Sequence, residues 1–146
     1  MDVQLWAKMN TEINDIFITP PDYEGFRIYS ERGIIGSWKD GGDILISKNY
    51  YVEWWERMED LGYKKSTAIF RWFGEEAIWY PLQELWIKIF NTRPQPVAVY
   101  GYDSLTERDF MRISKKYNAS YVVIKKPNKL NFMQVHENKY FRVYKL

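Results

Sequence analysis

The sequence predicts an α/β fold: a mixed sheet flanked by helices, with a C-terminal strand-helix-strand unit and a closing hairpin. The first observation is that short apolar runs of strand length alternate with longer segments whose apolar residues recur at helical spacing. The second is the continuous apolar run over residues 121–124, which is typical of a strand buried on both faces of a parallel sheet. The third is a pair of strand-like runs that ends the chain around a short turn.

The first thirty-five residues predict a helix followed by a strand. Residues 3–12 carry apolar side chains at helical spacing, which indicates a short amphipathic helix. Residues 16–18 form an apolar run that indicates a buried strand, and it must end at Thr19-Pro20-Pro21 because proline cannot continue a central strand. Residues 26–29 and 34–35 each fit either a strand or the end of a helix.

The middle of the chain predicts two further helices. Residues 49–61 place aromatic and aliphatic residues on one face and acidic residues on the other, and Gly62 is a natural C-terminal stop. Residues 75–91 repeat the helical pattern. Short apolar runs at residues 68–70 and 97–100 indicate strands.

The last third begins with a helix-initiation pattern. Residues 104–107, Ser-Leu-Thr-Glu, form a capping box in which each terminal side chain can satisfy the other residue's backbone N–H. The helix then runs to Tyr117, and Asn118 suits the left-handed terminal position. With the strands on either side, this helix predicts a parallel right-handed unit. Residues 132–135 and 140–144 form the closing antiparallel pair.

Length and composition predict one globular domain over residues 1–146. The chain has 146 residues, of which 46% are hydrophobic and 27% charged, values that are ordinary for a folded domain and exclude general disorder. The net charge of +2 is too small for a protein whose main task is to bind nucleic acid, so we expect no nucleic-acid partner. No run of about 18 apolar residues exists, and the first residues lack the pattern of a secretory leader.

Several kinds of chemistry are excluded by residue counts. The absence of cysteine excludes thiol nucleophiles, redox pairs and thiolate zinc sites. His136 is the single histidine, so a multi-histidine metal site is excluded, and a structural role for this residue is expected. Residues 36–42 hold the one glycine cluster, but they match neither of the phosphate-binding glycine motifs. We therefore predict no catalytic residue, no metal site and no cofactor; acid–base catalysis by a pair of carboxylates is the one route that residue counts leave open.

One polar segment remains as a candidate site. Residues 22–43 combine five carboxylates with Arg27, Arg32 and Lys39. Because the loops at the ends of strands form the ligand site of open sheets, we predict that Asp22, Tyr23, Arg27 and Arg32 cluster at one rim. The alternative is structural: Arg32 could fix the loop by pairing with Asp22 or Glu24.

Aromatic residues are abundant, with seven Trp, twelve Tyr and eight Phe. Core packing explains most of them, whereas Trp38 and Trp72 lie beside loop or charged residues and are expected to be more exposed. Exposed rings of this kind stack on sugars or on bases. Asn118-Ala119-Ser120 is an N-glycosylation sequon, whose position at a helix end already has a structural explanation.

The first sixty residues resemble a known kind of membrane-protein domain. The residues that carry the resemblance are Leu5-Trp6, Asn10-Thr11, Asp15 to Asp22, Gly25-Phe26-Arg27, Ser30-Glu31-Arg32, Trp38-Lys39, Glu53-Trp54 and Arg57. This pattern resembles the soluble region that follows the membrane part of multi-pass GT-C glycosyltransferase-type proteins. The C-terminal helix, the strand at residues 121–124 and the closing hairpin fit the same resemblance.

A more distant similarity is to the soluble domain of archaeal and bacterial oligosaccharyltransferases. There the first strand leads into a Trp-Trp-Asp-Tyr-Gly motif that helps to bind the acceptor sequon. Here the corresponding segment is Pro20-Pro21-Asp22-Tyr23-Glu24-Gly25, so Asp22 and Tyr23 match while prolines replace both tryptophans. In such enzymes the catalytic acid and the metal belong to the membrane part, so the resemblance implies a non-catalytic domain.

Two hypotheses of function follow. The first is a non-catalytic, extracytoplasmic domain of a membrane-bound glycosyltransferase-like protein, whose partners are a glycan or acceptor peptide and the transmembrane part of the parent protein. Its substrate-binding residues would be Asp22, Tyr23, Arg27, Arg32, Trp38 and Lys39. The second is a free-standing, small cytosolic α/β enzyme that uses the carboxylate-rich loop at residues 22–43.

Overall fold

A five-stranded mixed sheet in the order β2-β1-β3-β5-β4 forms the centre of the protein. The structure is a computed structural model that describes residues 2–40, 48–63 and 101–146, all of which belong to one compact unit. The strands are β1 (Ile16–Ile18), β2 (Gly33–Ile34), β3 (Tyr121–Lys125), β4 (Met133–Glu137) and β5 (Phe141–Lys145). β1 runs parallel to β2 and β3, whereas β5 is antiparallel to both β3 and β4.

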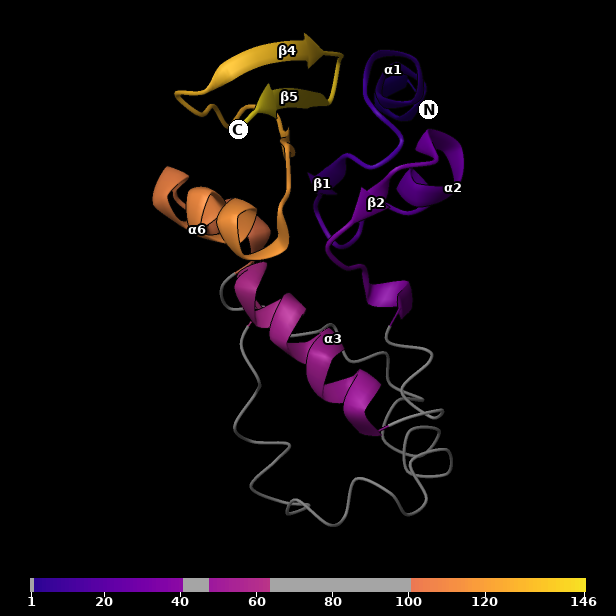
Figure 1. The fold of residues 1–146 in the computed structure, drawn as a ribbon. Coiled ribbons are helices and arrows are strands. Elements are labelled where there is room, and N and C mark those ends of the chain that lie inside the picture. The colour runs from indigo at the N-terminus through magenta and orange to yellow at the C-terminus, as the bar shows by residue number, and fades with distance from the viewer. Residues whose placement is uncertain (1, 41–47, 64–100) are drawn as a thin grey trace, which may run out of the picture. The chain divides into compact units, whose positions relative to one another are not determined.

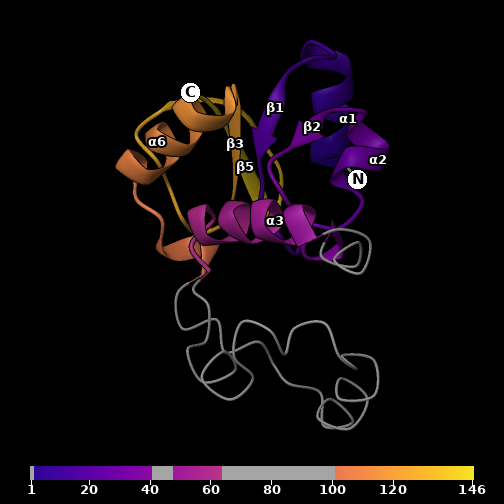
Figure 2. The same cartoon turned by 60° about the horizontal axis from the view of Figure 1, so that its bottom comes forward.

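Helices cover both faces of this sheet (Figures 1 and 2). On one face lie α1 (Asp2–Asn10) and α2 (Phe26–Ser30), which pack against each other. On the other face lie α3 (Lys48–Asp60), the 3-10 helix η3 (Tyr102–Ser104) and α6 (Glu107–Tyr117). The α/β class and the mixed sheet flanked by helices, with its C-terminal hairpin, are confirmed.

The continuous apolar run of β3 is explained by these two layers. Tyr121 and Val123 belong to the core on the α1 and α2 side, whereas Val122 and Ile124 belong to the core on the α3 and α6 side. All four side chains are buried. Successive side chains of a strand point to opposite faces, so a strand covered on both sides must be apolar at every position.

Each face has its own aromatic packing. On the α1 and α2 side, the ring of Phe17 stacks on Tyr121 with centroids 4.9 Å apart, and Phe26 packs against Phe17 at 5.1 Å. On the other side, Tyr102 meets Phe110 edge to face at 5.5 Å. Most described aromatic residues lie in or pack against these two cores. Burial of such a side chain stabilises the fold by about 1.5–3 kcal/mol.

Most of the elements predicted within the described residues are confirmed. These are the helix at residues 3–12, the strands at residues 16–18 and 121–124, the helix at residues 49–61, the helix that ends at Tyr117 and the closing antiparallel pair. The segment at residues 26–29, left open between strand and helix, is helical. It begins after Gly25, whose φ of 71° lies in the left-handed region. Asn118 does adopt the left-handed conformation, with φ 53°.

The predicted capping box is wrong by two residues. The Ser104 hydroxyl bonds the Gly101 carbonyl at 2.7 Å inside η3, so it is not free to cap α6. Thr106 is the N-cap instead: its hydroxyl accepts from the backbone N–H of Asp109, whose carboxylate accepts from the Thr106 backbone N–H at 2.9 Å. The sequence contains two overlapping box patterns, and the 3-10 turn decides between them.

Other predictions lie outside the described residues. They are the strands at residues 68–70 and 97–100, the helix at residues 75–91, and the positions of Gly41, Gly42, Asp43 and Trp72. Within the described part of the chain, the parallel neighbour of β3 is β1. No helix among the described residues is both long and apolar enough to cross a membrane.

Candidate functional site

The carboxyl ends of the parallel strands lie at one edge of the sheet. There β1 ends before β3 does. The last residue pair between them is Ile18 with Val122, after which Pro20 ends β1 while β3 continues to Lys125. In open α/β sheets, ligands bind outside the carboxyl ends of the strands, at the point where the strand order reverses. Here that point lies between β1 and β3: the strand that follows β1 in the chain, β2, pairs with one side of β1, and β3 pairs with its other side.

Tyr102 closes the space between the two diverging strands. Its hydroxyl lies 3.0 Å from the Ile18 carbonyl oxygen and 2.8 Å from that of Val123. These carbonyls belong to the point where β1 and β3 no longer pair, so the tyrosine replaces a missing backbone partner. Burial raises the pKa of Tyr102 well above its usual value, and the hydroxyl remains a donor.

An ion pair links the loop after β1 to the end of β3. Lys125 Nζ lies 2.6 Å from Asp22 Oδ2, and the two side chains are 40% and 53% exposed. Partial burial opposes the charge on Lys125, but the hydrogen bond to Asp22 and the nearby carboxylate of Asp103 outweigh it, so the net pKa of the lysine is raised. The pair therefore consists of two charged groups that are accessible to a ligand.

Tyr63 completes what we call the carboxyl-edge cluster: Asp22, Tyr63, Tyr102, Asp103 and Lys125. Burial, and then the charge of Asp22, raise the pKa of Tyr63. Its position depends on Gly62, whose φ is 94° and at which an added Cβ would lie 2.9 Å from the Gly101 carbonyl oxygen. Glycine is therefore required where the end of α3 passes the segment that leads into η3.

Trp38 lies beside this cluster rather than projecting into solvent. It packs edge to face on Tyr63, with ring centroids 4.8 Å apart, and on Trp54 at 6.0 Å. Its backbone N–H donates to the Pro21 carbonyl at 3.1 Å, which holds the loop after β2 against the loop after β1. Trp38 is half-buried, so the expectation that it is an exposed ring is correct only in part.

Tyr23, Arg27 and Lys39 lie near these loops but have other contacts. The Tyr23 hydroxyl donates to Gln4 at 2.8 Å, and burial, followed by the charge of Asp2, raises the pKa of Tyr23 to about 12. Arg27 makes two hydrogen bonds to Asp40, at 3.1 and 3.3 Å. Lys39 is exposed.

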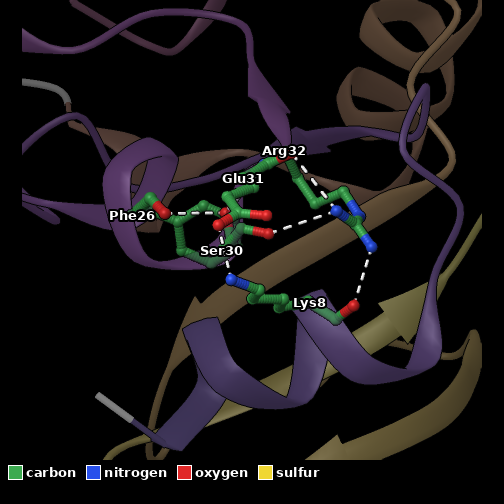
Figure 3. A network of polar contacts seen from close by, with 5 residues as sticks. All are labelled: Lys8, Phe26, Ser30, Glu31 and Arg32. Carbon is green, nitrogen blue, oxygen red and sulfur yellow. Dashed lines mark hydrogen bonds and ion pairs between the residues drawn. The ribbon is translucent and has the colours of Figure 1, made fainter.

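Arg32 has a structural role (Figure 3). Its side chain donates five hydrogen bonds: to the carbonyls of Lys8, Thr11, Ser30 and Glu31 at 2.6–3.3 Å, and to the Thr11 hydroxyl at 3.0 Å. The residue is only 6% exposed. The carbonyls lie at the C-terminal ends of α1 and α2, where the helix dipole favours a positive charge.

The four residues predicted to form one cluster therefore have separate partners. Asp22 follows the end of β1 and Arg32 precedes the start of β2, and because these strands are parallel, the two residues belong to opposite edges. The alternative, in which Arg32 pairs with Asp22 or Glu24, is also wrong, since Arg32 bonds carbonyls and a hydroxyl. Its guanidinium could not be distinguished by sequence from one that binds a ligand.

His136 has the structural position expected from the sequence. Its ring is 20% exposed and stacks on Trp6, with centroids 5.0 Å apart and 11° between the planes. The nearest carboxylate oxygen, Oδ1 of Asp2, lies 3.7 Å from Nε2. Among the residues that the structure describes, no group of three or more carboxylate or histidine side chains is arranged to hold a metal ion.

Comparison with known proteins gives one match. Residues 1–61 match a family described as a domain of unknown function, DUF6798. Searches of curated proteins and of solved structures found no match. The matched segment contains β1, β2 and the loop that carries Asp22, whereas Tyr63, Asp103 and Lys125 of the carboxyl-edge cluster lie beyond it.

Proposed function

We propose that this chain is the non-catalytic recognition domain of a membrane-bound glycosyltransferase-like protein and that it contacts the acceptor or the glycan at the carboxyl-edge cluster. The observation that carries the proposal is the exposed ion pair between Asp22 and Lys125, which joins the loop after β1 to the end of β3. The resemblance of residues 5–57 to the soluble region of such membrane proteins supplies the biological context.

The chemistry of the cluster suits a polyhydroxylated or peptide ligand. A carboxylate and an ammonium group exchange hydrogen bonds with hydroxyl or amide groups, and charged hydrogen bonds are the stronger ones. Tyr63 and Trp38 add aromatic surface with a polar end, which is favoured where a ligand is apolar on one side and wet on the other. Asp22 and Trp38 come from loops at a sheet edge, where binding residues concentrate, and Lys125 is the last residue of β3 at that edge.

The alternative, a small enzyme that uses the carboxylates of residues 22–43, has less support. Such chemistry needs two carboxylates that face each other or a substrate. Instead, Asp22 pairs with Lys125, Asp40 pairs with Arg27, and Glu31 pairs with Lys8. Three of the candidate carboxylates are thus distributed over three separate ion pairs.

The direct test is binding of a soluble glycan panel and of an acceptor peptide to the purified chain, followed by NMR. We expect perturbed backbone amides at Asp22, Tyr63 and Lys125, and at least about a tenfold loss of affinity in Asp22→Asn, since a charged hydrogen bond contributes about 1.5–3 kcal/mol. Turnover of a glycoside or phosphate ester that Asp22→Asn or Asp43→Asn abolishes would overturn the proposal in favour of the enzyme.

A matched control exists within the chain. The ion pair between Lys8 and Glu31 has side-chain exposures of 44% and 54%, nearly those of Lys125 and Asp22. It links α1 to the end of α2, away from the carboxyl ends of the strands. Glu31→Gln should therefore leave glycan or peptide affinity unchanged. An equal loss in Glu31→Gln and Asp22→Asn would mean that neither charge acts through the proposed site.

The membrane part of the proposal needs a separate measurement. The reading frame upstream of Met1 should encode transmembrane segments, and a topology reporter fused after Leu146 should be active on the extracytoplasmic side. A ribosome-binding site directly before Met1, or a reporter active only in the cytoplasm, would contradict this part.

A further inference from the structure

The segment from the end of β3 to the start of β5 carries a concentration of positive charge. Residues 125–142 contain five lysine or arginine residues and one glutamate, whereas the whole chain has a net charge of only +2. The rest of the chain is therefore net negative, and the excess positive charge lies in this segment. A concentration of one sign of charge on a surface attracts partners of the opposite sign.

Hydrogen bonds join the turn of the β4-β5 hairpin to the loop that follows β3. The Lys126 backbone N–H donates to the Tyr140 carbonyl at 2.8 Å. Arg142 donates to the carbonyls of Pro127 at 3.0 Å and of Asn128 at 2.5 Å, and the next residue after Asn128 is a lysine. The basic and aromatic side chains gathered here form what we call the basic tip: Lys126, Lys129, Lys139, Tyr140 and Arg142.

The positive charge of the basic tip is only partly neutralised. Glu137 Oε2 lies 3.0 Å from Lys126 Nζ and 3.5 Å from Arg142 Nε, so one carboxylate is shared by two cations. Lys129 and Lys139 are exposed, and neither forms an ion pair with another residue that the structure describes. The tip therefore retains positive charge that is accessible from solvent.

The carboxylates of the neighbouring carboxyl-edge cluster do not cancel this charge. Asp22 is paired with Lys125 at 2.6 Å. Asp103 Oδ1 lies 3.4 Å from the side-chain amide of Asn128. The basic tip, its Glu137 partner and the cluster together hold five basic side chains and three carboxylates, so this edge remains net positive.

Tyr140 is a large aromatic side chain that the fold leaves in solvent. It is 62% exposed, and Lys139 Nζ lies 5.2 Å from the centroid of its ring. The turn is held by the Asn138 side-chain oxygen, which accepts from the backbone N–H groups of Tyr140 and Phe141, both at 2.8 Å. Phe141 packs against the core on the α1 and α2 side. An anchored turn thus presents an aromatic ring and an ammonium group together.

We propose that the basic tip rests on the surface of a bilayer that contains anionic phospholipids. The inference rests on the membrane-bound function proposed above. Ammonium groups close to such a surface are attracted by its negative potential. Tyrosine is favoured at the level of the lipid headgroups, where its ring has apolar surroundings and its hydroxyl remains in water. The pairing of Lys139 with Tyr140 fits both requirements.

A nucleic acid is the other common partner of basic and aromatic residues, and two observations disfavour it. The chain as a whole has a net charge of only +2, which is small for nucleic-acid binding. The tip also has one aromatic ring, Tyr140, whereas single-stranded nucleic acids are bound by rings on which successive bases stack. A lipid surface requires only one ring at the interface.

The basic tip lies at the same edge of the sheet as the carboxyl-edge cluster. Lys125, the last residue of β3, pairs with Phe141, which follows Tyr140 directly. Contact of the tip with a bilayer would therefore hold the ion pair of Asp22 and Lys125 near the membrane surface. A weak attraction is sufficient, because the membrane part of a parent protein would keep the tip at a high effective concentration beside the lipid.

The test is flotation of the whole chain with vesicles of phosphatidylcholine, either alone or mixed equally with phosphatidylglycerol, and with no glycan present. We expect binding to the anionic vesicles at low ionic strength and release as salt screens the charges. Lys139→Ala should lower the partition coefficient about fivefold, the effect of one basic residue near an anionic surface. Tyr140→Ser should lower it at every salt concentration, because its contribution is not electrostatic.

Lys115→Ala is the matched control. Lys115 is an exposed residue of α6 that forms no ion pair with another described residue, so the variant loses the same charge at a place away from the tip. It should bind anionic vesicles as the unchanged protein does. Equal losses in Lys115→Ala and Lys139→Ala would overturn the proposal, because net charge alone would then explain the binding.

Three further outcomes would also overturn the proposal. One is equal binding, or no binding, to the neutral and the anionic vesicles. Another is displacement by inorganic phosphate at the same phosphate concentration, which would indicate a site for a free anion. The third is tighter binding to a single-stranded oligonucleotide than to the anionic vesicles. Glycan or peptide binding at Asp22 without vesicle binding would refute this inference alone, whereas vesicle binding without glycan or peptide binding would support it and refute the recognition function.

Discussion

The two ends of the parallel strands use charged residues in opposite ways. At the amino ends, Arg32 is buried and bonds four carbonyls and a hydroxyl, so its whole hydrogen-bonding capacity is satisfied within the protein. At the carboxyl ends, Asp22 and Lys125 share a single contact and remain about half exposed. The first arrangement fixes helices, and the second leaves hydrogen-bonding capacity for a ligand.

The difference shows why a charged residue in a loop does not by itself indicate a site. The contacts of the charged residue determine its role. A guanidinium surrounded by carbonyls at helix ends stabilises those ends, whereas an exposed ion pair contributes little to stability. The predictions below test this contrast, in which changes at the amino ends should affect stability and changes at the carboxyl ends should affect binding.

The largest effect is expected for Arg32→Ala. The substitution leaves the C-terminal carbonyls of α1 and α2 without their charged donor, and since a hydrogen bond to a charged group contributes about 1.5–3 kcal/mol, we expect a loss of about 3 kcal/mol. Urea unfolding should show this loss in the free energy of unfolding. Arg27→Ala is the control, since this arginine is exposed and pairs with Asp40. A loss no larger than that of the control would show that the contacts of Arg32 are dispensable.

Tyr102→Phe should have the next largest effect. The ring still fills its place beside Phe110, but the carbonyls of Ile18 and Val123 lose the hydroxyl between them. We expect the free energy of unfolding to fall by about 1–2 kcal/mol. Tyr140→Phe, at a residue that is 62% exposed, should change it by much less. Equal effects would mean that Tyr102 does not replace a strand partner.

The contrast also explains which parts of the protein could be predicted from sequence. β1, β3 and the hairpin follow from local patterns, since apolar runs and prolines act within a few residues of the chain. The predicted capping box is two residues too early because the Ser104 hydroxyl donates to the Gly101 carbonyl in a 3-10 turn. The spacing of apolar residues does not indicate such a turn.

The site was predicted less well, for a physical reason. Asp22 was found because it follows a strand end, but its partner Lys125 is 103 residues away along the chain. Tyr63 and Asp103 also reach the cluster only through tertiary packing. One signal was present in the sequence: Lys125 directly follows the apolar run at residues 121–124, and that position is at the carboxyl edge of a parallel sheet.

A smaller, pH-dependent effect is expected at the contact between α3 and α6. Burial alone would raise the pKa of Asp60, but hydrogen bonds from Lys116, Arg112 and Tyr117 outweigh it, and the pKa falls below its ordinary 3.8. A lowered pKa in the folded state stabilises the protein above the unfolded pKa, and this contribution is lost as the pH falls through the folded value.

Asp60→Asn should therefore reduce stability by about 1 kcal/mol at pH 7, and the difference from the unchanged protein should shrink below about pH 4. Urea unfolding at a series of pH values measures it. Glu56→Gln, which removes a more exposed partner of Lys116, should give a smaller difference. A difference that stayed constant down to pH 2 would show that the charge of Asp60 is not the cause.

The smallest effect on stability is expected where the effect on binding is largest. Asp22→Asn removes one member of an exposed pair, and such pairs contribute about 0–1 kcal/mol, so the free energy of unfolding should change by less than about 0.5 kcal/mol. After the Asp22 charge is removed, the carboxylate of Asp103 can still attract the Lys125 ammonium group. The variant should thus be as stable as Glu31→Gln while losing affinity for the glycan or peptide. If Asp22→Asn instead destabilised the protein as strongly as Tyr102→Phe, the ion pair would be a structural contact like that of Arg32. The two ends of the strands would then no longer differ in the way the proposed function requires.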